Sequence, residues 1–332
     1  MWLVFALITL LFWSGSDLFS KIGSPENDKY SHFKIVTSVG LIMGLHAMYS
    51  IFIGKVPISL DAVIAYLPAS LLYIISMLIG YIGLKYIELS VSSPICNSSG
   101  AITAILCFFV LRQRLDMPQT IAVVIICIGV FMLGVTEYTE DDEKRQLRQS
   151  ESGRKYTKSF LALTLPLCYC LLDSIGTFVD SIILDTEATA VSQFTGGFLT
   201  NETGNRFLSL LMYGRLNEET ANTAYELTFL LIGIICAIYV FGIKRDKPTV
   251  KADTPKLLGG LCETIGQFTY VFAISANPIG SAPVISAYCV ASVLWSRIFL
   301  KEKLSLKHYL CIALVITGII ILGILEGISG DV

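Results

Sequence analysis

The sequence predicts an all-α polytopic membrane protein in which ten transmembrane helices form two inverted five-helix repeats. Three observations predict this fold class: the composition, a series of long apolar segments, and a match between the two halves of the chain. Hydrophobic residues make up 54% of the 332 residues and charged residues only 15%, whereas a soluble domain carries about 25% charged residues. Lys and Arg total 24 against 26 Asp and Glu, so there is no basic excess to bind nucleic acid.

The apolar segments are each long enough to cross a bilayer as a helix, which takes about 20 residues. None shows the alternation of apolar and polar residues that a transmembrane barrel requires. The segments cover approximately residues 2–21, 33–53, 62–86, 91–111, 118–137, 159–183, 224–243, 256–275, 280–300 and 306–326.

Two connections between the segments are long. Residues 138–158 are highly charged and are typical of a solvated linker, whereas residues 184–223 have a mixed composition. We therefore expect a first five-helix repeat at 1–137, a linker at 138–158 and a second repeat at 159–326. The stretch 184–223 is then an insertion between the sixth and seventh helices, as a hairpin, a short surface helix or a partly disordered segment.

An internal repeat is the strongest feature of the sequence. Residues 92–135 align without a gap on residues 281–324, and the same offset carries Tyr81 onto Tyr270. The identical pairs are Ser92 and Ser281, Pro94 and Pro283, Leu111 and Leu300, Leu115 and Leu304, Gly129 and Gly318, Leu133 and Leu322, and Gly134 and Gly323. A weaker match, at another offset, places Trp13 on Tyr169 and Asp17 on Asp173.

The repeat fixes the relative orientation of the halves. Five spans per half is an odd number, so the second half must enter the membrane in the opposite direction. Inverted repeats of this kind are typical of secondary transporters, which place their site between the halves and rock between two states. Pro94 and Pro283 are expected either to bend their helices or simply to mark helix ends.

Several motifs resemble those of the drug/metabolite transporter superfamily, EamA type. Residues 300–304 read LKEKL and residues 111–115 read LRQRL, both close to the basic turn of that family but without its usual glycine. Residues 13–17 read WSGSD and are followed by Lys21, a near match to the start of the family's first helix. The resemblance implies a ten-helix exporter or permease of small metabolites, with a cavity lined by the first four helices of each half.

Charged groups inside the apolar segments are candidate site residues, because a charge at bilayer depth normally faces a cavity or a partner. Helical spacing places Asp17 on one face with Trp13, near Ser14, and an aromatic ring beside a carboxylate suits a cation. Asp17 could also gain and lose a proton and so couple transport to a proton gradient. The alternative is an interfacial Asp17 paired with Lys21.

The second half offers a similar set. Asp173 and Tyr169 occupy the sixth segment, and Glu263, Gln267 and Tyr270 form a polar stripe along the eighth. Glu263 could instead extend to the membrane surface. The remaining candidates are Asn97, Ser98 and Tyr288, for which close helix packing is the alternative. We expect Asp180 to be interfacial and His46 to be packed or hydrogen-bonded.

The sequence thus favours a transporter of the plasma membrane that moves a small organic metabolite or drug by alternating access. The excess of acidic groups at depth favours a cationic or zwitterionic solute, such as an amino acid or amine. The expected partners are this solute and the bilayer, with no nucleic acid and an open oligomeric state. The alternatives are a channel, a non-transporting scaffold or, less favoured, a membrane-embedded enzyme. Three scattered histidines and nine cysteines without C-x-x-C spacing give no catalytic, metal or cofactor site.

Two observations disagree on which side of the membrane the termini lie. Most Lys and Arg residues lie in the odd-numbered loops, which places those loops in the cytoplasm and both termini outside. The family resemblance implies termini inside.

Overall fold

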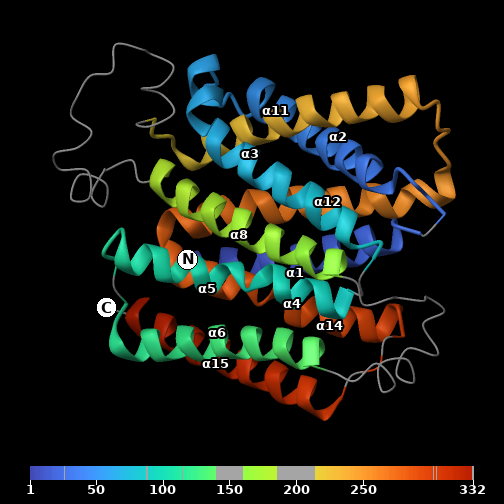
Figure 1. Cartoon of the computed structure of the whole chain (residues 1–332). Helices are drawn as coiled ribbons and strands as arrows, with labels where there is room; N and C mark the ends of the chain where they lie inside the picture. The colour runs from blue at the N-terminus through green and yellow to red at the C-terminus, as the bar shows by residue number, and fades with distance from the viewer. Residues whose placement is uncertain are drawn as a thin grey trace.

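The computed structural model describes residues 1–332 except 26, 87–88, 114, 140–159, 185–213, 302, 304 and 331–332. The predicted linker at 138–158 and most of the insertion at 184–223 therefore lie outside the described residues. The described part is all helical, with the helices running side by side in one bundle (Figure 1).

The first half contains five helical spans. In chain order they are α1 Trp2–Ile22, α2 Ser31–Phe52, α3 Leu60–Gly83, α4 Leu89–Asn97 continued by α5 Ser99–Phe109, and α6 Met117–Thr139. The second half repeats this order with α8 Phe160–Ile183, α11 Glu218–Ala237 continued by the π-helical turn η1 Ile238–Ile243, α12 Val250–Ala276, α13 Pro278–Ser286 continued by α14 Tyr288–Phe299, and α15 Leu306–Gly330.

The predicted fold class is confirmed. Within the described residues, nine spans are long and apolar enough to cross a membrane, and α15 is apolar over Leu306–Leu322. The outer surface carries large exposed side chains such as Leu45 and Ile75, while carboxylates such as Asp180 and Glu226 are buried. This apolar-outside pattern is the one that a bilayer requires.

The helices of the two halves pair across the centre of the molecule. α1 packs on α12, and its repeat mate α8 packs on α3. The mates α2 and α11 pack on each other, as do α6 and α15. Glycines allow these close contacts: a Cβ added at Gly40 of α2 would lie 2.6 Å from the Phe229 carbonyl oxygen of α11.

Backbone conformation repeats with the same symmetry. Within the described residues, four non-glycine residues adopt positive φ: Lys55, Arg112, Arg245 and Lys301, all between 53° and 57°. Lys55 and Arg245 follow the second span of each half, and Arg112 and Lys301 follow the fourth. A left-handed residue just past a helix end is a common helix terminator, and here both halves use a basic residue for it.

The fourth and ninth spans are both interrupted, which the sequence did not predict. Pro94 and Pro283 lie inside α4 and α13 and do not mark the ends of their spans. The break comes one turn later, at the equivalent residues Ser98 and Ala287. There the Ser98 hydroxyl donates to the Pro94 carbonyl oxygen at 3.0 Å, and the Ala287 N–H reaches both the Pro283 and Val284 carbonyl oxygens.

Two predicted helix starts were wrong by six residues. The eighth span begins at Val250 rather than at 256, and the seventh begins at Glu218 rather than at 224. The Asn217 side chain accepts a bond from the Thr220 N–H at 2.9 Å, and Glu218 and Glu219 occupy the first turn. A side-chain cap and acidic groups at the N-terminus both stabilise a helix start.

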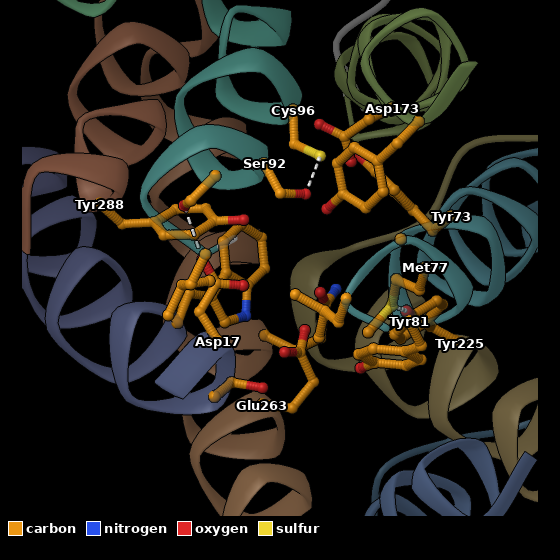
Figure 2. Close-up of a pocket in the computed structure, with 18 residues that line it drawn as sticks. Asp17, Tyr73, Met77, Tyr81, Ser92, Cys96, Asp173, Tyr225, Glu263 and Tyr288 are labelled. Atoms are coloured by element: carbon orange, nitrogen blue, oxygen red, sulfur yellow. Dashed lines mark hydrogen bonds between the residues drawn. The ribbon is translucent and has the colours of Figure 1, made fainter. Parts of the chain in front are cut away.

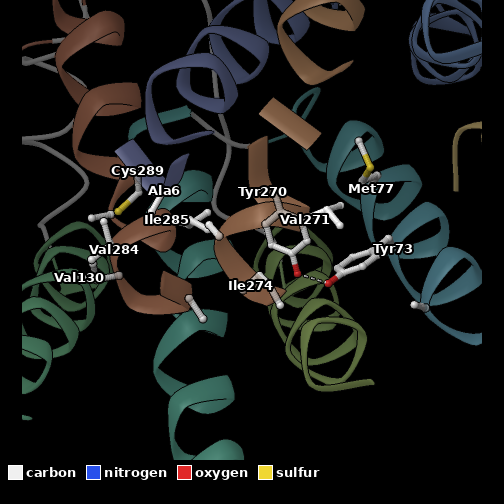
Figure 3. Close-up of a cluster of buried hydrophobic side chains, with 14 of the residues drawn as sticks. Ala6, Tyr73, Met77, Val130, Tyr270, Val271, Ile274, Val284, Ile285 and Cys289 are labelled. Atoms are coloured by element: carbon white, nitrogen blue, oxygen red, sulfur yellow. Dashed lines mark hydrogen bonds between the residues drawn. The ribbon is translucent and has the colours of Figure 1, made fainter. Parts of the chain in front are cut away.

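Buried apolar side chains from both halves form the core that holds these spans together. Figure 3 shows part of it, in which Val284, Ile285 and Cys289 of the ninth span lie close to Ala6 of α1. Tyr73 and Tyr270 belong to the same cluster, and their hydroxyl groups meet.

Candidate functional site

A cavity lies between the two halves, with about 60 Å³ open to water-sized molecules. Because one water molecule needs about 10–15 Å³ of such open volume, the cavity has room for only a few waters. Its walls come from α1, α3 and α4 of the first half and α8, α11, α12 and α14 of the second. Both halves therefore contribute to one central site.

Three carboxylates face the cavity. Asp17 comes from α1, its repeat mate Asp173 from α8, and Glu263 from α12. Figure 2 shows Asp17 and Glu263 on one side and Asp173 across from them. The described lining residues include no Lys, Arg or His, so this buried space has a strong excess of acidic groups.

Serines of the interrupted spans hold the two aspartates. Asp17 Oδ2 accepts bonds from Ser93 of α4 at 2.7 Å and from Ser292 of α14 at 2.9 Å. Asp173 Oδ2 accepts a bond from Ser99 of α5 at 2.8 Å. The breaks in the fourth and ninth spans therefore lie beside the residues that orient both carboxylates.

Glu263 is only 8% exposed and lies in the cavity wall. Ser16, one residue before Asp17, lines the same cavity. Glu263 therefore does not extend to the membrane surface, which was the alternative that the sequence left open.

Aromatic rings cover most of the remaining wall. Trp13 stacks on Tyr270 with ring centroids 5.0 Å apart and meets the edge of Tyr288 at 5.9 Å. The aromatic lining residues of the cavity are Trp13, Tyr73, Tyr81, Tyr169, Tyr225 and Tyr288. Rings and carboxylates together attract organic cations, through charge and through the negative ring faces.

The repeat mates Trp13 and Tyr169 are seated in the same way. A Cβ added at Gly266 of α12 would lie 2.4 Å from Trp13, and one added at Gly80 of α3 would lie 2.8 Å from Tyr169. Each ring therefore lies against a glycine in the third span of the other half.

A second, smaller hollow of about 20 Å³ adjoins the cavity. It shares Trp13, Tyr169, Asp173 and Tyr288 with the cavity and adds Asn97, Ser99, Thr177, Tyr270 and Ser286 to the lining. The shared residues make it a polar extension of the central site.

Hydrogen-bonded tyrosines lie between helices of the two halves, on the side of the cavity toward the end of the bundle where both termini lie (Figure 1). Tyr73 donates a bond to Thr177 at 3.1 Å and shares another with the Tyr270 hydroxyl. About two turns before Tyr73 on α3, Tyr66 donates to Asp180 at 2.7 Å. We use the name tyrosine gate for Tyr66, Tyr73, Thr177, Asp180 and Tyr270. Asp180 was expected to be interfacial and lies in the last turn of α8, but it is fully buried by protein rather than open to water. Tyr66 bonds its Oδ1, while Oδ2 has no hydrogen-bond partner among the described residues.

Lysines gather at the opposite end, where Asp28 is shared between two of them, Asp246 also pairs with Lys34 and Asp253 also pairs with Lys256. Asp28 lies 3.2 Å from both Lys34 and Lys256, and Lys85 donates to its backbone carbonyl oxygen. Lys21 bonds the Leu84 carbonyl oxygen at 2.5 Å. We call Lys21, Lys34, Lys85, Lys256 and Asp28 the lysine gate.

The charges of the lysine gate shift the pKa values of its members outside the spans. Burial alone would raise the pKa of Asp28, but the neighbouring Lys256 and Lys34 hold it below its usual value. Burial lowers the pKa of Lys85, helped by the nearby Lys256 and Lys34 and opposed by Asp28.

The structure brings together most of the residues singled out in the sequence. Those lining the cavity are Trp13, Asp17, Tyr169, Asp173, Glu263, Gln267 and Tyr288, and Asn97 and Tyr270 line the smaller hollow. Ser14 and Ser98 line neither space. The Ser14 hydroxyl bonds the Leu11 carbonyl oxygen at 2.7 Å and accepts from Trp295 at 3.0 Å, so it holds helices together.

Sequence reasoning missed the contribution of α3. Tyr73, Met77 and Tyr81 are spaced four residues apart and line the cavity from one helix face. The signal was the repeat, because Tyr81 aligns on Tyr270. Outside the cavity, His46 Nδ1 lies 2.7 Å from Glu226 Oε1, which confirms the expected hydrogen-bonded histidine.

Comparison with known proteins adds three findings. The sequence pattern of the EamA-like transporter family matches residues 1–135 and 209–324. An uncharacterized protein of Methanocaldococcus jannaschii is 27% identical over 137 residues, which are 40% of this chain and 96% of that protein. A solved crystal structure shares the fold with a TM-score of 0.61 at 11% identity, covering 97% of this chain and 96% of that one.

Proposed function

Because the chain belongs to the EamA-like transporter family, we propose that it moves a small cationic or zwitterionic organic solute through the central cavity by alternating access. Membership of the family makes it a multi-pass membrane transporter and not an enzyme. The solute class, the site residues and the membrane are the proposed parts, and we place the protein in the plasma membrane.

The observation that carries the solute class is the charge of the cavity. Asp17, Asp173 and Glu263 face a space whose described lining offers no cationic side chain. Buried carboxylates require a positive partner or a proton. An amine or an amino acid supplies that positive charge, and the aromatic walls supply contact area for an organic group.

The size of the cavity supports alternating access. About 60 Å³ is too little for an organic amine together with its water shell, so the halves must move apart for the solute to enter. The tyrosine gate and the lysine gate lie at opposite ends of this space, where a rocking carrier needs its two closures. A channel would instead require a continuous path.

The proposed transport is compatible with two modes of energy coupling. The carrier is either facilitative or coupled to protons, because a carboxylate emptied of its cation can take up a proton in its place. A proton gradient across the vesicle separates the two for an amino acid or a quaternary ammonium solute, which cannot cross the bilayer as a neutral base: it drives accumulation of such a solute only in the coupled form.

The test is solute counterflow in liposomes, with pools of amino acids, primary amines and quaternary ammonium compounds. We expect exchange of a cation or zwitterion, reduced by about tenfold or more in Asp17→Asn, because a charge-assisted bond contributes about 1.5–3 kcal/mol. Asparagine retains an acceptor for Ser93 and Ser292, so the fold is preserved. Asp173→Asn is the matched variant in the other half, and exposed Asp116→Asn is the control.

Exchange of an anion or a neutral sugar that is unaffected by Asp17→Asn would overturn the solute class and the site while leaving the family role intact. Uncoupled flux without exchange would favour the channel alternative.

A further inference from the structure

We propose that the hollow between residues 25–30 and 244–252 is a binding site for the headgroup of an anionic phospholipid. The hollow has a volume of about 560 Å³ and lies at the lysine-gate end of the bundle, away from the central cavity. One wall is the α1–α2 loop of the first half, and the other is the α11–α12 loop of the second half.

The charge of the hollow calls for an anion. Among the described residues, five cationic side chains line it against two acidic ones. Lys34 already forms ion pairs with Asp28 and Asp246, at 3.2 and 2.9 Å. The remaining four, Lys29, Lys244, Arg245 and Lys247, are exposed and have no ion pair among the described residues. The phosphate of a phospholipid whose headgroup carries no cation would offset part of this positive charge.

The surroundings of the hollow point to a lipid as the source of that phosphate. The outer face of α11 and η1 exposes Ile234, Ile235, Ile238 and Ile243 and leads along the bilayer to the hollow. Acyl chains can lie along this face while the headgroup reaches the basic side chains. Tyr30 and Tyr239, at the depth where aromatic side chains meet lipid headgroups, support Lys29 and Lys244 with ring centroids 5.7 and 5.4 Å from the ammonium groups.

The position of the hollow, between loops of the two halves, indicates how a bound lipid would act on the protein. The lipid would bridge two loops from different halves, and Asp28 and Lys34 belong both to the hollow and to the lysine gate. A bound anionic headgroup therefore stabilises the closed arrangement of this end. Basic pockets between transmembrane helices are known binding places for anionic headgroups.

The test compares thermal stability and lipid retention of the purified full chain with phosphatidylglycerol and with phosphatidylcholine. Phosphatidylglycerol should raise the melting temperature more than phosphatidylcholine does. It should also remain bound in native mass spectrometry. The Lys244→Gln/Arg245→Gln variant should bind phosphatidylglycerol about tenfold or more weakly, because each basic side chain near an anionic lipid adds to the free energy of binding. The control is Lys301→Gln/Lys307→Gln, which removes two charges at the same end and, like the test pair, includes one left-handed residue.

Two results would overturn the proposal. Equal loss of phosphatidylglycerol binding in both variants would show a general effect of net charge. Equal stabilisation by inorganic phosphate alone would assign the hollow to a soluble anion. The test measures lipid binding and thermal stability and not transport of the solute. Its outcome is therefore independent of the proposed function.

Discussion

The two ends of the central cavity are related by the internal repeat but are closed by different chemistry. The tyrosine gate consists of hydroxyl groups around one buried carboxylate, Asp180. The lysine gate consists of ammonium groups around Asp28, part of it exposed to water. Hydroxyl bonds are directional and act at short range, whereas ion pairs act over longer distances and depend on salt and on pH. The same architecture is therefore closed at one end by geometry and at the other by charge.

The largest effect is expected from Asp28→Asn. The substitution removes the carboxylate that Lys34 and the fully buried Lys256 share. Lys34 keeps Asp246 at 2.9 Å and Lys256 keeps Asp253 at 2.7 Å, so the expected cost is that of a lost charge-assisted bond, about 1.5–3 kcal/mol. We expect the lysine gate to open and a lower melting temperature. Cys96 lines the cavity, so in a variant keeping only that cysteine, a membrane-impermeant thiol reagent added from the lysine-gate side should label it faster.

Asp116→Asn is the control, because Asp116 is exposed and lies in a loop at the other end. Unchanged labelling of Cys96 in Asp28→Asn would show that Asp28 does not hold this end closed.

A smaller effect is expected from Tyr66→Phe at the tyrosine gate. Asp180 then loses its donor, and an unsatisfied buried acceptor costs about 1–3 kcal/mol. The same Cys96 assay should show faster labelling from the side of the termini and no change from the lysine-gate side. Tyr86→Phe, at an exposed tyrosine, is the control. If both sides respond equally, the two ends do not act as separate closures.

The smallest effect is expected from moderate changes of pH. Because the pKa of Asp28 is lowered in the folded protein, its contribution to stability is present above its unfolded pKa of about 3.9 and is lost as the pH falls through the folded value. The lysine gate should therefore be equally closed from pH 5 to pH 8 and weaken only below about pH 4. Labelling of Cys96 in Asp28→Asn, measured over the same range, separates this effect from the reactivity of the thiol. A transition of the unsubstituted gate near pH 6 would contradict the assignment to Asp28.

The sequence predicted the ten spans, their inverted halves and the three cavity carboxylates because each is visible locally. A charge within an apolar segment stands out, as Asp17 and Glu263 do, and a duplicated turn can be aligned. The burial of Asp180 could not be predicted, because hydropathy does not show that Tyr66 of another helix packs against it. Tyr73 and Tyr81 were missed because tyrosine suits a lipid face, a core and a cavity equally.

The lysine gate was missed for another reason. Lys21, Lys34 and Lys256 lie close to the ends of three different spans, where basic residues are ordinary. Only the folding of the α1–α2 loop places Asp28 among them. Contacts of this kind depend on tertiary structure and leave no trace in local composition.

The glycines under Trp13 and Tyr169 have a mechanical consequence. Each ring lies against a glycine of the opposite half, where an added Cβ would come within 2.4 Å of Trp13 at Gly266 and within 2.8 Å of Tyr169 at Gly80. A side chain at either glycine would push the ring away from its helix and toward the cavity. The width of the solute path therefore depends on two backbone positions that carry no chemistry of their own.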